Sequence, residues 1–261
     1  MRASTRRNNK YRRPLSDIHC CDGGMEMRKI TVICAAALLI SALLLSACGR
    51  TEQPPAVPTL GEAQRMLVID PGHGGEDGGA QGENGLLESD INLEIALRME
   101  ALARFCGVPV CMTRSTREID YPPELQKTAE RKLWDQKQRV ALLHELAPAV
   151  LVSIHQNKYP HHGPFGPQVL YAEGEDSKGL GELMHGLLTQ KLCPENRRVA
   201  APIAKEIYLT RMADCPAVLV ECGFLSNPAE AEKLTSPDYQ IKLACTLLCA
   251  YTQYFSASKG T

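Results

Sequence analysis

Four short segments of the chain carry side chains that can bind a metal ion or move a proton. They are Asp70–Gly75, Leu87–Asp90, Ser153–Asn157 and Val220–Phe224. Three of the four follow an apolar run typical of a strand, and open α/β sheets gather ligands and catalytic groups at the carboxyl ends of their strands. Taken together, the segments predict a single hydrolytic site.

Metal-assisted hydrolysis is the chemistry that fits these side-chain types. A catalytic zinc ion is held by about three protein ligands and keeps one position open for water. Two histidines and a carboxylate are a suitable ligand set, because bound zinc lowers the pKa of water towards roughly 7 and polarises a scissile carbonyl. A further carboxylate can then carry protons.

His73 lies in a glycine-rich stretch just beyond the strand expected to end at Asp70. Glycine lets a backbone turn tightly and approach a ligand closely. The alternative is a phosphate-binding loop, but the spacing matches neither G-x-x-x-x-G-K-[ST] nor G-x-G-x-x-G, and Glu76 and Asp77 would repel a phosphate. Taken alone, His73 fits a metal ligand and an ordinary loop residue equally well.

Each of the other candidates also has a plainer interpretation when taken alone. Glu88 precedes a helix expected to be capped by Asp90, where the helix dipole favours a carboxylate. His155 closes a buried apolar run and fits a hydrogen-bonded core histidine. Glu221 ends another apolar run, where a charge is costly unless it is paired or has a catalytic role. The prediction of a site therefore depends on finding these residues together.

The segment that follows His155 is expected to shape the site. Tyr159–Pro167 is rich in proline and glycine and predicts a loop that forms one wall of a cleft. His161 and His162 within it are interpreted as surface loop residues rather than metal ligands.

The charge distribution excludes a nucleic-acid-binding protein. Residues 1–29 contain 8 basic and 3 acidic side chains, and the remaining chain contains 21 and 27. The larger part therefore carries net negative charge and predicts no basic face for nucleic acid.

The first 64 residues predict that the protein is exported, and they are expected to lie outside the catalytic domain. After the basic extension 1–29, residues 30–49 carry no charge and fit either a signal peptide or a membrane anchor. Their ending resembles a bacterial lipobox with Cys48 as the lipidated residue, the alternative being an apolar cysteine within an anchor. The proline-rich segment 50–64 predicts a linker. The signal-peptide and the membrane-anchor interpretations both place the expected catalytic domain, residues 65–258, outside the cytoplasm.

From residue 65 onward, apolar strand-like runs alternate with helical patterns. Continuous apolar runs predict strands buried on both faces, and their alternation with helices predicts an α/β fold with a mainly parallel sheet. The expected strands are Met66–Asp70, Val108–Arg114, Val150–His155, Gln168–Ala172, Glu206–Thr210 and Ala217–Glu221. The expected helices are Asp90–Phe105, Lys127–Glu145, Asp176–Leu192 and Asp238–Phe255.

The four segments, in this order, resemble the catalytic domain of zinc-dependent N-acetylmuramoyl-L-alanine amidases of the type-3 family. The resemblance covers about Met66 to Phe255. It implies an open, twisted sheet of about six strands with helices on both faces. It also implies that His73, Glu88 and His155 bind Zn²⁺ and that Glu221 is the catalytic acid/base.

The implied reaction is hydrolysis of the amide that joins N-acetylmuramic acid to L-alanine in peptidoglycan. Within the family, a single domain behind an N-terminal membrane segment most resembles the spore-cortex amidase of germination, which prepares muramic lactam with a partner deacetylase. A vegetative cell-wall amidase is the alternative. A non-catalytic peptidoglycan-binding lipoprotein and another zinc hydrolase, such as a stem-peptide carboxypeptidase, are further alternatives.

Overall fold

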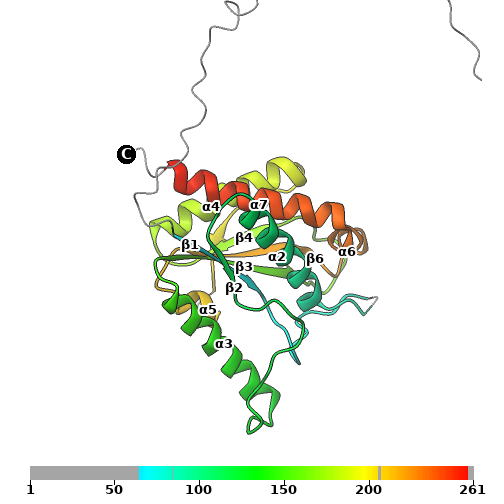
Figure 1. Cartoon of the computed structure of the whole chain (residues 1–261). Coiled ribbons are helices and arrows are strands. Elements are labelled where there is room, and N and C mark those ends of the chain that lie inside the picture. Colours follow the sequence, from blue (N-terminus) through cyan, green and yellow to red (C-terminus); the bar gives the residue numbers. More distant parts are fainter. Residues whose placement is uncertain (1–64, 84, 205–206, 258–261) are drawn as a thin grey trace, which may run out of the picture. The chain divides into compact units, whose positions relative to one another are not determined.

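Six strands form one sheet in the order β2-β1-β3-β6-β4-β5 (Figure 1). The computed structural model describes residues 65–83, 85–204 and 207–257. The strands are β1 (Met66–Pro71), β2 (Val110–Met112), β3 (Ala149–Asn157), β4 (Gln168–Tyr171), β5 (Ala201–Pro202) and β6 (Ala217–Phe224). All neighbours pair in parallel except β4 and β6, which are antiparallel. The expected open, mainly parallel α/β sheet is confirmed.

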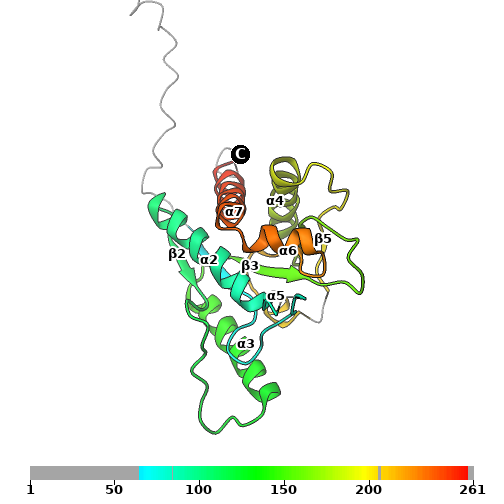
Figure 2. The same cartoon turned by 90° about the vertical axis from the view of Figure 1, so that its right-hand side faces the viewer.

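Helices cover both faces of this sheet, as Figures 1 and 2 show. They are α2 (Glu88–Phe105), α3 (Thr128–Glu145), α4 (Glu175–Leu192), α5 (Tyr208–Arg211), α6 (Pro228–Thr235) and α7 (Pro237–Ala257). One core cluster packs alternate strand residues such as Ile69 and Val220 against α2, α4 and α7. A second packs Val68 and Leu151 against α3 and α5. Because successive strand residues face opposite sides, each central strand is apolar throughout.

Two sequence predictions of local structure are wrong. The strand expected at Glu206–Thr210 is absent from the described part, where Tyr208–Arg211 is the short helix α5 and buries Leu209 beneath the sheet. The edge strand is instead Ala201–Pro202. A run such as Ile207-Tyr208-Leu209-Thr210 has the β-branched and aromatic composition of a strand, and tertiary packing overrides that local preference.

The start of α2 also differs from the expectation. Asp90 does not cap it, because the helix begins at Glu88 with Leu87 at the N-cap and no side-chain cap bond. Carbonyls of the preceding loop satisfy the first N–H groups instead: Glu88 donates to Ala80 at 2.9 Å and Ser89 to Gly78 at 3.1 Å. This places the Glu88 carboxylate on the first turn and ties the loop to the helix.

The predicted extension 1–29, anchor or signal segment 30–49 and linker 50–64 lie outside the described residues. Of the described helices, none combines the length and apolarity needed to cross a bilayer.

A buried ion pair holds the carboxyl end of β1. Asp70 accepts hydrogen bonds from Arg139 of α3 at 2.7 Å, from Ser153 of β3 at 2.6 Å and from Thr113 at 2.6 Å. Burial alone would raise the pKa of Asp70, but Arg139 and the two hydroxyl donors outweigh it and lower the pKa to about 2. The pair therefore joins β1, β3 and α3 at the sheet edge where the loop containing His73 begins.

Replacing Asp70 with asparagine removes this anion and leaves Arg139 buried without its charge partner. We expect Asp70→Asn to lower the free energy of unfolding at pH 7 by about 3 kcal/mol. Folding lowers the pKa of Asp70 from 3.8 to about 2. Its stabilising effect is therefore complete above about pH 4 and is lost as the pH falls towards about 2. Urea unfolding across this pH range measures both effects.

The matched control is Asp214→Asn, because Asp214 forms an exposed ion pair with His144. We expect this change to cost no more than about 0.5 kcal/mol. Identical pH profiles of stability for the wild type and Asp70→Asn would contradict the assigned role of Asp70.

Candidate active site

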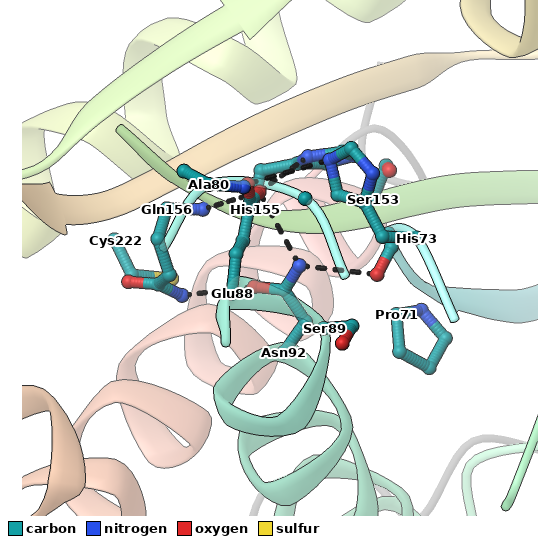
Figure 3. Close-up of polar contacts among 12 residues, drawn as sticks. Pro71, His73, Ala80, Glu88, Ser89, Asn92, Ser153, His155, Gln156 and Cys222 are labelled. Atoms are coloured by element: carbon teal, nitrogen blue, oxygen red, sulfur yellow. Dashed lines mark hydrogen bonds and ion pairs between the residues drawn. The ribbon is translucent and has the colours of Figure 1, made fainter. Parts of the chain in front are cut away.

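The Glu88 carboxylate lies at the centre of the site, between two imidazole rings (Figure 3). Its Oε1 is 2.9 Å from His155 Nδ1, and its Oε2 is 3.4 Å from His73 Nε2. Backbone N–H groups of Ala80 and Gln156 donate to the same carboxylate at 2.8 and 3.0 Å. Glu88 is 4% exposed, so this carboxylate has a fixed position on the first turn of α2.

His73 is oriented by contacts to its backbone and to its ring. Its φ of 61° lies in the left-handed region, which is uncommon for a residue with a side chain. Arg114 and Arg139 both donate to its carbonyl at 2.7 Å and hold this conformation. Asp77 Oδ2 lies 2.9 Å from His73 Nδ1, and Lys132 of α3 contacts the same oxygen at 2.8 Å. The Nε2 atom of His73 therefore points towards Glu88.

His155 and Glu221 face the site from neighbouring strands. They are register partners in the parallel β3–β6 ladder, and paired residues emerge on the same face of a sheet. A Cβ atom on Gly72 would lie 2.2 Å from His155 Nε2. The absence of a side chain at Gly72 thus provides the space that the His155 ring occupies.

Glu221 carries a buried oxygen that makes no hydrogen bond. Its Oε2 has no partner among the described residues. Burial raises the pKa of Glu221 to about 7, and the negative charge of Glu88 contributes in the same direction while His155 and His73 oppose it. A carboxyl group that titrates near neutral pH can both accept and donate a proton during turnover.

The remaining three residues have the arrangement of a metal-binding cluster. One ligand atom from each of His73, Glu88 and His155 lies within 4.8 Å of the others. Burial alone would lower the pKa of His73, but hydrogen bonds with Asp77 and Glu88 raise it to about 9. Burial would raise the pKa of Glu88, but the two histidines hold it well below its usual range. The raised pKa of His73 shows that the acidic groups around it favour positive charge, and the lowered pKa of Glu88 keeps that carboxylate ionised, as a cation ligand must be.

The structure brings together all four residues that the sequence singled out, and it adds groups that position them. Asn92, one turn after Glu88, donates to Gly72 O at 3.1 Å and to Glu88 Oε1 at 3.4 Å. The sequence analysis missed Asn92, although its i to i+4 spacing from Glu88 on a predicted helix could have indicated it. Asp77 was considered only as a group that repels phosphate, and its partner Lys132 carries no local signal, because α3 comes near the loop only in the fold.

Comparisons with known proteins agree with this geometry. Residues 67–250 match the family model of N-acetylmuramoyl-L-alanine amidase. The chain is 35% identical over 206 residues to the germination-specific N-acetylmuramoyl-L-alanine amidase of Bacillus subtilis, an alignment that covers 78% of this chain and 84% of the relative.

Solved structures show the same similarity. The CwlD amidase of Clostridioides difficile, solved in complex with the GerS lipoprotein, has a TM-score of 0.71 and 32% identity, covering 74% of this chain and 99% of that one. A second N-acetylmuramoyl-L-alanine amidase, from Clostridium difficile 630, has a TM-score of 0.64 and 26% identity over 75% and 98% of the two chains.

The fold and the site therefore define a domain of the α/β class with a candidate metal centre, and the chain belongs to the N-acetylmuramoyl-L-alanine amidase family. It is an enzyme that acts on the amide between N-acetylmuramic acid and L-alanine of peptidoglycan. The resemblance seen in the sequence is confirmed.

Adding one methyl group at Gly72 tests the packing of His155. In Gly72→Ala the new Cβ would overlap His155 Nε2, so the ring must move. A displacement of about 1 Å at a reacting centre costs about 10²-fold in rate, and we expect at least that loss in the release of stem peptides from peptidoglycan. Circular dichroism verifies that the variant is folded.

Gly82→Ala is the control in the same loop, because the nearest atom to its Cβ would be the Leu225 carbonyl oxygen at 3.6 Å. It should retain wild-type activity. Wild-type activity in Gly72→Ala would show that the site does not depend on this placement of His155.

Proposed function

We propose that His73, Glu88 and His155 hold a catalytic Zn²⁺ ion and that Glu221 is the general acid/base. The observation that carries this proposal is the convergence of two imidazoles and a buried carboxylate, with an unpaired carboxyl oxygen on the adjoining strand. Two histidines and a glutamate are a known ligand set for catalytic zinc. The rings of His73 and His155 are 21% and 20% exposed, which leaves the cluster accessible to substrate.

When bound, zinc supplies Lewis acidity, which acidifies water and polarises the scissile carbonyl. The proton transfers are assigned to the protein. In the proposed reaction Glu221 accepts a proton from the attacking water and returns it to the departing amine of L-alanine. Asp77 and Asn92 hold His73 and Glu88 in position, as outer-shell partners do in metal sites. The products are a free lactyl carboxylate on the sugar and a stem peptide with a free amino terminus.

Glu221→Gln separates proton transfer from metal binding. We expect the rate of stem-peptide release to fall by about 10²- to 10⁴-fold, while binding of about one equivalent of zinc, measured by equilibrium dialysis, is unchanged. Treatment of the wild type with a chelator should abolish activity, and added zinc should restore it. Mass spectrometry of the products identifies the cleaved bond.

Glu182→Gln is the matched control, because Glu182 is an exposed glutamate on α4. This substitution should leave the rate of stem-peptide release unchanged. A Glu221→Gln variant with the wild-type rate would refute the role of Glu221. Products with new sugar reducing ends and an intact lactyl amide would refute the proposed reaction.

We infer that the substrate is spore-cortex peptidoglycan. The similarity to the germination-specific amidase of Bacillus subtilis and to the CwlD amidase supports this inference. Amide hydrolysis frees the lactyl carboxyl group, and a partner deacetylase would free the sugar amine with which it closes a muramic lactam. The predicted export segment 30–49, with membrane anchoring or lipidation at Cys48, would place the domain 65–258 outside the cytoplasm to meet this substrate.

The requirement for the amidase in muramic lactam formation provides a test of the cortex assignment. Cortex peptidoglycan treated with the amidase and then with a peptidoglycan deacetylase should yield muramic lactam, detected by mass spectrometry of the digested glycan. Omitting the amidase, or using Glu221→Gln, should prevent lactam formation. Release of peptides from vegetative wall but not from cortex would contradict the assignment.

A further inference from the structure

A cavity of about 380 Å³ lies beside the proposed catalytic centre. It is lined by residues that directly follow the site residues in the sheet: Asn157 comes two positions after His155, and Phe224 three after Glu221. Gln168, another lining residue, is the register partner of Glu221 in the β4–β6 ladder. The cavity and the centre therefore share one edge of the sheet.

The predicted loop Tyr159–Pro167 does form a wall of this cavity, through Tyr159, His161 and Pro164. His161 and His162 are both exposed, as expected. The loop is fixed in place, because Tyr159 N donates to Ser226 Oγ at 3.0 Å and Asn227 Nδ2 donates to Pro164 O at 3.2 Å.

Arg198 is the cationic residue of the cavity, and its position is fixed from several sides. Its backbone N–H donates to Asn196 Oδ1 at 3.1 Å, and its carbonyl oxygen lies 2.8 Å from His185 Nε2. Its guanidinium lies over the Phe224 ring at 4.5 Å and donates to the carbonyl of Phe165. A guanidinium held in this way loses little further conformational freedom when it binds a ligand.

The guanidinium has donors to spare. Arginine carries five N–H donors, and in the described part of the chain the Arg198 side chain donates to the Phe165 carbonyl and has no salt bridge to a carboxylate. Asn157 and Gln168 also line the cavity, and the Gln168 amide nitrogen donates to Val199 O at 3.2 Å. A partly enclosed guanidinium that forms no salt bridge within the described residues is suited to bind a carboxylate of a peptide.

We propose that Arg198 binds a free carboxylate of the stem peptide and makes this enzyme selective for acidic stem peptides. The inference rests on the proposed function, since it places the scissile amide at His155 and Glu221. A stem peptide leaving that centre along β4 would bring a residue just beyond L-alanine into the cavity, because one extended residue spans about 3.3–3.6 Å. In peptidoglycan the carboxylate can come from the γ-linked glutamate at the second position or from a diamino acid at the third.

Synthetic muropeptides with a carboxylate or a carboxamide at the second or the third position test this proposal. For the wild type we expect kcat/KM to be about 10- to 100-fold higher for the carboxylate form at one of these positions, mainly through KM. Arg198→Gln should remove the preference by slowing the carboxylate form alone, and Arg198→Lys should retain part of it. The position at which the preference is lost identifies the bound carboxylate.

Arg197→Gln is the control, because Arg197 is the exposed neighbour of Arg198 and lies outside the cavity lining. The preference of this variant for carboxylate substrates should match that of the wild type. Calorimetric binding of the same muropeptides to Glu221→Gln, with and without Arg198→Gln, gives a readout independent of turnover. An equal loss for carboxylate and carboxamide substrates in Arg198→Gln, or a wild type indifferent to both positions, would overturn the proposal. Failure of the wild type to cleave any muropeptide at the lactyl amide would instead overturn the proposed function.

Discussion

The structure of the site depends on one buried carboxylate. Glu88 lies between the imidazoles of His73 and His155 and accepts two backbone N–H bonds. A buried anion is costly unless it is paired and hydrogen-bonded, so these four contacts constrain one another. They join the first turn of α2, the loop after β1 and the end of β3 around one point where a cation is favoured.

Contacts from the surrounding strands and helices hold the residues around Glu88 in fixed positions. Arg139 reaches from α3 to both Asp70 and the carbonyl of His73, so the same guanidinium holds the strand end and the strained loop residue. Gly72 leaves space for His155. Evenly spaced parallel strands place His155 next to Glu221. The groups proposed for metal binding and proton transfer therefore have positions that are set by backbone geometry and by buried charge.

Sequence patterns predicted the sheet and singled out candidate residues that the fold brings together, because buried parallel strands are continuously apolar and a polar residue at the end of such a run stands out. His155 and Glu221 were found in this way. The strand expected at Glu206–Thr210 was wrong because its composition is that of a strand, whereas Tyr208–Arg211 forms the short helix α5. Arg139 and Arg198 act through contacts with residues far away in the chain. Their roles could be seen only after folding.

The central claim is that His73, Glu88 and His155 share one metal ion. The most direct measurement is anomalous diffraction at the zinc edge from crystals of the full chain grown with one equivalent of zinc. The account predicts a single strong peak at about 2.0–2.2 Å from a nitrogen of each histidine and an oxygen of Glu88, with a remaining position open to solvent. A peak elsewhere, or three side chains directed to separate places in the presence of zinc, would contradict it.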